Sequence, residues 1–164
     1  MANYSYQNIG RLNFNTKNFL GANIDLNIVQ RAVPDITLGA AIHPTPMKFM
    51  PIPGDSLDIS DLILTFILDE NWTEYILLFK WIALLKNCKG ANLKDYYTDA
   101  RLTINTAKQN SIFNFIYYDI HPYNLQQIDI DDQTVDAEVL KFSAAFKISN
   151  IGLEEPDKLT RIVE

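Results

Sequence analysis

Residues 54–87, GDSLDISDLILTFILDENWTEYILLFKWIALLKN, are the most informative part of the chain, because an apolar strand is followed there at once by a helix. We expect the strand to run from Leu57 to Leu68. Its second half is apolar at almost every position, which predicts a strand covered on both faces. The helix is predicted over Asn71 to Leu85, where apolar residues recur at intervals of three and four.

Two adjacent carboxylates, Asp69 and Glu70, separate this strand from the helix. Neighbouring side chains at the end of a strand point to opposite faces, so these two do not converge as an acid and base pair would. Asn71 and Glu74 fit a capping box, and both carboxylates lie at the positive end of the helix macrodipole. We therefore interpret Asp69, Glu70, Asn71 and Glu74 as the start of a helix.

Strand patterns dominate the rest of the chain. We interpret residues 1–18 as an arm or edge strand, 24–28 as a strand, 102–104 with 112–120 as a β-hairpin, 121–136 as a loop, and 139–148 as a final strand with alternating apolar residues. One helix among strands predicts a mainly β fold of the α+β class. We expect an antiparallel β-barrel or sandwich with one central amphipathic helix packed on it.

A proline-rich stretch, residues 40–55, interrupts the strand patterns. It contains Pro44, Pro46, Pro51 and Pro53. Each proline lacks a backbone donor and has a fixed φ, which rules out a helix or a central strand. We predict a long, partly extended loop or arm. Such a loop is too long for a compact domain unless it docks on a neighbour.

Length and charge restrict the class of protein. At 164 residues the chain is expected to form a single domain over 1–164. Its formal net charge of −6 argues against a protein that grips a phosphate backbone. The lone Cys88 excludes an intrachain disulfide and favours a reducing compartment. The sequence has no secretory signal pattern and no apolar run near the about 20 residues of a membrane span, so we expect a soluble, intracellular protein without a membrane partner.

No group of residues has the pattern of a catalytic, cofactor or metal site. His43 and His121 are far apart in the sequence, and no activated-serine motif is present. The acidic run at 128–136 lacks the central glycine and final glutamate of a calcium loop. The aromatic run at 113–118 has no flanking basic residues of the kind that an RNA-stacking platform uses. We predict a protein that is not an enzyme and has no cofactor.

The order of these patterns resembles the tube proteins of contractile-tailed (myovirus) phages. The resemblance is carried by Pro53-Gly54-Asp55 before the strand, by Asp69-Glu70 before a helix that contains Trp81, and by the turn at Val33 to Gly39, similar to an LPxxxxG turn. A β-hairpin and a final alternating strand follow in the same order. The resemblance covers residues 12–150 and leaves 151–164 as a C-terminal extension beyond the last strand.

The resemblance implies a fold shared with type VI secretion tube proteins, and subunits that form hexameric rings stacked into a tube. The implied partners are further copies of the chain, tail sheath and baseplate or terminator proteins. DNA would pass through the lumen without specific binding. The implied location is the tail of a virion, with assembly in the host cytoplasm. A specialised ring of the same fold, at the baseplate end as tube initiator or at the tail terminus, stays open as an alternative.

Two surfaces are predicted to contact neighbouring subunits. The first is the proline-rich arm, with Pro44, Pro46, Met47, Phe49, Pro51 and Pro53. The second is a side of the helix with Leu78, Trp81 and Leu85. A small-molecule-binding β-barrel or enzyme is a competing class, which would need a pocket that unites Asp69 or Glu70 with His43 or His121. A nucleic-acid-binding module is a third class, which the acidic composition opposes.

Overall fold

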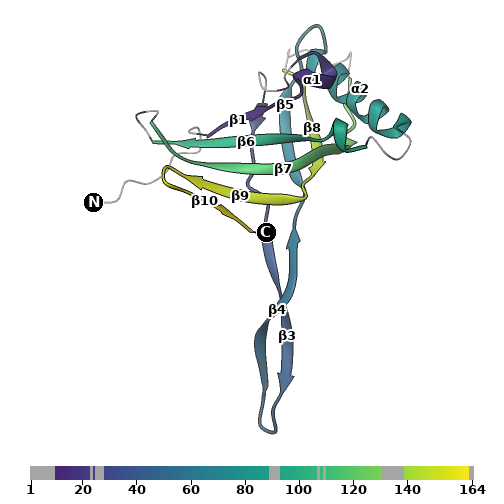
Figure 1. Cartoon of the computed structure of the whole chain (residues 1–164). Helices are drawn as coiled ribbons and strands as arrows, with labels where there is room; N and C mark the ends of the chain where they lie inside the picture. Colours follow the sequence, from purple (N-terminus) through teal and green to yellow (C-terminus); the bar gives the residue numbers. More distant parts are fainter. Residues whose placement is uncertain are drawn as a thin grey trace.

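A computed structural model describes residues 10–22, 24, 28–88, 93–106, 108, 110–130 and 139–162. The fold is mainly antiparallel β with one long helix, as the sequence predicts. Two sheets of the body share one strand and cross each other, and a two-stranded arm extends far from the body (Figure 1). We name these sheets A and B.

Sheet A joins strands from the beginning, middle and end of the chain. Its strands are β1 (Gly10–Phe14), β6 (Thr98–Asn105), β7 (Ser111–Leu125), β9 (Asn150–Glu155) and β10 (Lys158–Arg161), paired in that order and all antiparallel. β6 and β7 form the predicted hairpin. β1 is an edge strand, as expected for the N-terminal segment, whose residues 1–9 lie outside the described part. Alternate residues of β1, such as Leu12 and Phe14, face the core.

Sheet B contains β2 (Ile28–Gln30), β5 (Leu62–Ile67), β8 (Lys141–Lys147) and the last part of β7. The alternation predicted for residues 139–148 is confirmed, because Phe142, Ala144 and Phe146 are all buried. The prediction that β5 is covered on both faces is wrong for a single chain. Leu62, Leu64 and Phe66 are buried, whereas the side chain of Ile63 between them is 56% exposed.

Strand β7 belongs to both sheets. Residues 114–118 pair with β9 in sheet A, and residues 121–125 pair with β8 in sheet B. The strand changes direction at Asp119, whose φ is 51°, and the pairing register shifts between Pro122 and Asn124. Residues 121–125 are therefore strand and not the predicted loop. A proline is tolerated here because the register shift interrupts the ladder.

One long helix packs on the apolar inner side of sheet B. This helix, α2 (Thr73–Asn87), places the buried indole of Trp81 between Phe19 and Phe146, at ring-centre distances of 5.3 and 6.2 Å. Phe19 lies on the short helix α1 (Lys17–Leu20). The indole N–H donates a hydrogen bond to the carbonyl oxygen of Tyr96, at 2.8 Å, on the 3₁₀ helix η1 (Leu93–Tyr96). α2 and both short helices thus meet at one aromatic cluster.

The proline-rich stretch is a β-hairpin and not a loop. Strands β3 (Ile36–Pro44) and β4 (Phe49–Ile59) form the arm and, among the described strands, pair only with each other. β4 ends at Ile59 and β5 begins at Leu62, so the strand predicted over 57–68 is divided between arm and body. The turn expected over residues 33–39 already contains the start of β3. Prolines fit here because an isolated two-stranded ribbon has only edge strands.

Two smaller expectations also change. The strand predicted at 24–28 begins at Ile28, and residues 25–27 lie outside the described part. The extension predicted over residues 151–164 holds strands β9 and β10, and β9 pairs with the centre of β7. The C-terminal segment is thus part of the body through Arg161. In the described part of the chain, no helix is long and apolar enough to cross a membrane.

Candidate assembly surfaces

The arm presents one continuous apolar face. Cross-strand partners point to the same side of a ribbon, and the pairs Ala40–Pro53, Ile42–Pro51 and Pro44–Phe49 alternate with Ala41–Ile52 and His43–Met50. The arm face is therefore formed by Ala40, Ile42, Pro44, Phe49, Pro51 and Pro53. Ile42 is 67% exposed and Phe49 is 74% exposed. An isolated hairpin without a packed face is marginal in water, so this face is a candidate contact surface.

Four of the residues predicted for the arm contact lie on this face: Pro44, Phe49, Pro51 and Pro53. Pro46 and Met47 form the two-residue tip, where Met47 is 96% exposed. The prediction missed Ile42. The signal that could have found it is the alternation of Ala40, Ile42 and Pro44, which matches the alternation of Phe49, Pro51 and Pro53 on the returning strand.

The prolines also determine which outer edges of the arm have free backbone donors. The backbone N–H of Thr45 donates to the carbonyl of Lys48, at 3.1 Å, so this pair and every second pair from it are the hydrogen-bonded ones. Pro44, Pro51 and Pro53 fall in the pairs between, whose backbone nitrogens point outward. The β4 edge therefore lacks donors at Pro51 and Pro53 and the β3 edge at Pro44, which disfavours the addition of a further strand, most of all on β4. The arm face is the candidate contact surface.

The second predicted contact surface, on helix α2, is wrong for two of its three residues. The side chains of Leu78 and Trp81 have no exposed surface and belong to the core, and Leu85 is partly buried against the same core. These residues lie on the side that meets α1 and sheet B. The outward side of α2 carries Ile76 and Phe79, both exposed. A helix that is apolar almost all round gave no sequence signal for which side faces the core.

The helix start differs from the predicted capping box. Helix α2 begins at Thr73, preceded by Trp72 in the left-handed conformation with φ 55°, and no side chain caps it at that position. The Asp69 carboxylate instead accepts hydrogen bonds from the backbone N–H and the hydroxyl of Thr73. Asn71 and Glu70 are exposed before the helix, and Glu74 is buried in its first turn. Asp69 thus stabilises the start of the helix, as predicted, but it does so by accepting hydrogen bonds from Thr73.

A polar cluster holds the base of the arm. Asp61, in the link between β4 and β5, forms an ion pair with Lys147 of β8 at 2.6 Å and accepts a hydrogen bond from the Tyr123 hydroxyl at 2.5 Å. The hydrogen bond from Lys147, and then that from Tyr123, lowers the pKa of Asp61, and the same contact with Asp61 raises the pKa of Lys147. Beside it, the N–H of Asp35 donates to the Ser60 hydroxyl. The cluster connects the base of the arm to strands β7 and β8 of the body.

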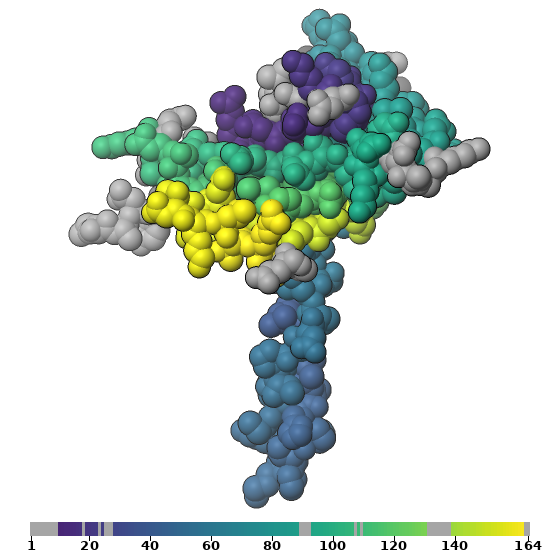
Figure 2. All heavy atoms as spheres, in the orientation of Figure 1, coloured from purple at the N-terminus to yellow at the C-terminus, as the bar shows by residue number. Residues whose placement is uncertain are grey.

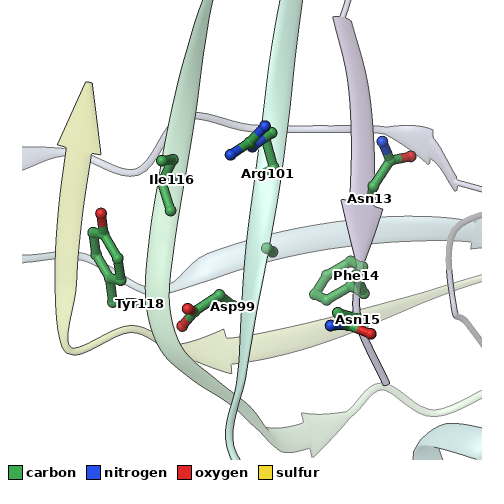
Figure 3. Close-up of a pocket in the computed structure, with 8 residues that line it drawn as sticks. Asn13, Phe14, Asn15, Asp99, Arg101, Ile116 and Tyr118 are labelled. Atoms are coloured by element: carbon green, nitrogen blue, oxygen red, sulfur yellow. The ribbon is translucent and has the colours of Figure 1, made fainter. Parts of the chain in front are cut away.

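The outer face of sheet A carries several polar and charged side chains. An open depression of about 530 Å³ on it is lined by Asn13, Asn15, Asp99, Arg101, Ile116 and Tyr118, among others (Figure 3). Arg101 forms an ion pair with Glu154 at 3.4 Å, and the Asn114 amide donates to the same carboxylate at 2.8 Å. A small-molecule-binding protein was predicted to have a pocket that unites Asp69 or Glu70 with His43 or His121. None of these four residues lines the depression. His43 lies on the arm, while His121 stacks on Tyr97 in the body.

Comparison with solved structures gives a consistent fold at low sequence identity. A chain of the anti-feeding prophage (AFP) baseplate, 6-fold symmetrised, matches with a TM-score of 0.73 and 11% identity, over 94% of this chain and 98% of that one. A chain of the sheath/tube terminator of the PVC extracellular contractile injection system gives 0.70 and 11%, over 94% and 99%. The Hcp1 protein of E. coli EAEC 042 gives 0.57 and 11%, over 93% and 96%.

No family model and no curated protein matches the sequence. At identities near 11% the structural likeness concerns the fold alone. It spans nearly the whole of each chain. The chain has the fold of the tube and terminator components of contractile injection systems, which is also the fold of Hcp proteins.

Proposed function

We propose that this chain is a structural, non-enzymatic ring subunit of the tube of a contractile phage tail. Copies associate into hexameric rings, and rings stack into a tube within a tail that also contains sheath, baseplate and terminator proteins. The observation that carries the proposal is the uncovered arm face, on a fold otherwise matched by tube components. A hairpin with no apolar cover in its own chain gains stability only when a neighbour covers it.

The charge of the chain supports a conduit for DNA. A net charge of −6 per subunit repels phosphates, so a channel built from many copies would let DNA slide without gripping it. Heterologous contacts between identical copies close into a ring when the rotation allows, and stacked rings form a filament. In this proposal the tube is part of a virion tail and is assembled in the host cytoplasm.

A second candidate is a specialised ring at one end of the tube. Similar structures include an AFP baseplate component and an AFP tube terminating cap, which keeps this candidate open. The two candidates differ in how far the rings stack. A main tube subunit stacks without limit, whereas an initiator or terminator ring stops after one layer.

Electron microscopy and mass photometry over a concentration series test the proposal. Long tubes support the main tube subunit, and single rings support the terminal ring. A protein that stays strictly monomeric at high concentration contradicts both.

A variant with a shortened arm tests the role of the arm. It replaces residues 42–51 by Asn-Gly, a two-residue turn that joins the cross-strand partners Ala41 and Ile52. We expect this variant to keep the circular dichroism spectrum and Tm of the wild type but to stay monomeric. Retained assembly would contradict the role of the arm.

A further inference from the structure

The arm has a β-bulge between the body and its tip. Leu38 of β3 pairs with Leu57 of β4, and two residues further along β3, Ala40 pairs with Pro53. Gly39 therefore lies opposite residues 54–56 of β4, where a regular ladder would place a single residue. Extra residues on one strand bend it and increase its twist, so the bulge influences the direction of the part of the arm beyond it.

Two glycines let the strands approach each other closely at this bulge. A Cβ atom on Gly54 would lie 2.9 Å from the carbonyl oxygen of Gly39 and 3.0 Å from its carbonyl carbon. Both are backbone atoms, so no side-chain rotation could relieve the overlap, and only glycine fits at residue 54 without a shift of the backbone. A Cβ atom on Gly39 would overlap the Ser56 hydroxyl, which can rotate away. We call this close approach the Gly39–Gly54 crossing.

The crossing joins two segments that carry the resemblance to tube proteins. Gly39 ends the turn segment 33–39, and Gly54 is the centre of Pro53-Gly54-Asp55. The arm face includes Pro53 but no residue of the turn segment, so the proposed function leaves most of both segments without a role. Their meeting at one point of the arm gives them a common structural task.

The arm is fixed on the body side of the crossing. The backbone N–H of Asp35 donates to the Ser60 hydroxyl at 2.8 Å, and the N–H of Ser60 donates to the Asp35 carbonyl at 2.9 Å. Ile59 packs against the core. Residues 36–38 and 57–59 are thereby held in one direction as they leave the body.

The part of the arm beyond the crossing extends away from the body. Residues 40–53 form this part and contain the whole arm face (Figures 1 and 2). Their direction therefore depends on the geometry of the two strands at the crossing. At about 3.3 Å per residue, the strand from Gly54 to Lys48 is about 20 Å long, so a small change of angle at the crossing moves the tip by a measurable distance.

We propose that the Gly39–Gly54 crossing is an elbow that sets the direction of the arm face relative to the body, with Gly54 as its positioning residue. The direction is a property of a single chain and does not depend on assembly. Only its consequence rests on the proposed function: copies that close into a ring need one repeating contact geometry, and a redirected arm changes that geometry.

Spin-label distances test the elbow, measured by pulsed electron paramagnetic resonance below the concentration at which the protein assembles. The background is Cys88→Ser, which removes the only cysteine. One label pair, Lys48→Cys with Asn13→Cys, joins the tip of the arm to sheet A. A reference pair, Thr37→Cys with Asn13→Cys, lies on the body side of the crossing. All three labelled positions are exposed.

A side chain at residue 54 should move the tip and leave the reference pair in place. To reach ordinary contact with Gly39, a Cβ atom there must move away by about 0.5 Å, which at a strand spacing of about 4.8 Å tilts the outer part of the arm by about 6°. We expect Gly54→Ala to change the tip distance by about 2 Å and Gly54→Val to change it by more. An unchanged tip distance in folded Gly54→Val would overturn the elbow. If Gly54→Val does not fold, Gly54→Ala decides in the same way.

Control variants separate the crossing from the general effect of an added methyl group. Gly10→Ala places a Cβ atom at 3.5 and 3.8 Å from side-chain carbons of Leu102 and Ile104, so it should leave both distances unchanged. Gly39→Ala should cause a smaller shift than Gly54→Ala, and adding Ser56→Ala should abolish it, because the overlapping hydroxyl is then absent.

Assembly of the unlabelled variants tests the consequence. Gly54→Ala should form at least tenfold less assembled material than the wild type, whereas Gly10→Ala should assemble normally. Normal assembly of a Gly54→Ala chain with a shifted tip would overturn the role of arm direction in assembly. A wild type that never assembles would overturn the proposed function and leave the elbow to the distance measurement.

Discussion

The Asp69 carboxylate accepts two hydrogen bonds from Thr73, one from its backbone N–H at 2.7 Å and one from its hydroxyl at 2.8 Å. The carboxylate therefore satisfies one of the free donors at the start of helix α2 from a position four residues upstream. Trp72 adopts a left-handed conformation between the two residues and lets the chain turn back on itself. The side chain that caps the start of the helix is the Asp69 carboxylate and not the Asn71 amide, so the helix begins at Thr73.

Replacing Asp69 by Ala should destabilise the protein and remove a pH dependence. We expect the Tm to fall by about 2–4 °C at neutral pH, from loss of the cap. The hydrogen bond from the Thr73 hydroxyl, and then that from its N–H, lowers the pKa of Asp69. A lowered folded-state pKa contributes stability above the unfolded value of about 3.9, and this contribution is lost as the pH falls through the folded value. Thermal scans from pH 2 to 7 should show the two proteins converging at the acidic end. Glu70→Ala is the control, and an equal loss in that variant would contradict the prediction.

Replacing Trp81 should affect folding before it affects assembly. Trp81→Ala leaves a cavity among Phe19, Phe146 and Leu78 and should lower the free energy of unfolding by about 3–5 kcal/mol. Trp81→Phe keeps most of the volume but leaves the Tyr96 carbonyl without its donor, at a cost of about 1–3 kcal/mol. Urea titrations of the monomer measure both values. A Trp81→Ala monomer of wild-type stability that fails to assemble would place Trp81 at an interface after all.

Restoring donors to the arm edge should make the arm associate through its edge. Pro51→Val together with Pro53→Val returns two outward N–H groups to β4, and the free edge then accepts another strand. We expect thioflavin T fluorescence and sedimenting material well below the concentration at which the wild type assembles. Ile52→Val, between the two prolines, changes a side chain without adding a donor and should behave as wild type. An absence of thioflavin-positive material from the double variant would mean that the prolines do not protect this edge.

Removing the Lys147 ammonium should weaken the base of the arm only at pH values at which Asp61 is ionised. The contact with Asp61 raises the pKa of Lys147, and a raised folded-state pKa contributes stability below the unfolded value of about 10.4 that is lost as the pH rises further. The pKa of Asp61 is lowered, so its own contribution holds above about 3.9. The wild type should therefore exceed Lys147→Met in Tm, by on the order of 2 °C, between about pH 4 and 10 and lose this advantage outside that window. High salt should reduce the difference. A difference that persists at pH 2 would point to the cation–π contact of the Lys147 ammonium with Tyr123, where its Nζ lies 4.8 Å from the ring centre.

The sequence predicted elements whose signals are local. The helix, the β6–β7 hairpin and the alternation of Phe142, Ala144 and Phe146 all depend on spacing within a few residues. The sequence also indicated that the arm residues Pro44, Pro46, Met47, Phe49, Pro51 and Pro53 lie outside the core, because prolines exclude the interior of a sheet, and they are exposed. Their contact with a neighbouring subunit stays a prediction.

The sequence did not predict what depends on distant partners. The arm was predicted as a partly extended loop or arm and not as a paired hairpin, because proline statistics describe buried ladders, whereas a ribbon with two free edges tolerates proline in every second pair. Leu78 and Trp81 were assigned to an interface because α2 is apolar almost all round, and only sheet B determines which side is buried. The exposure of Ile63 was missed for a similar reason. Its strand is apolar on both faces, as predicted, but a single chain covers only one of these faces.

The pairing of strand β8 has a consequence for when copies can meet. Residues 36–59 form a hairpin that can close on itself as soon as it leaves the ribosome, on a timescale of microseconds. Strand β5 completes its sheet only with β8, 82 residues later for the partners Ile63 and Ala145. Such long-range pairing is slow and follows the synthesis of the later strand. The arm is therefore complete well before sheet B of its own chain. In the proposed assembly, nascent copies on one messenger would present arms before any of them had a complete body, so the order of translation itself would delay polymerisation until whole subunits are released.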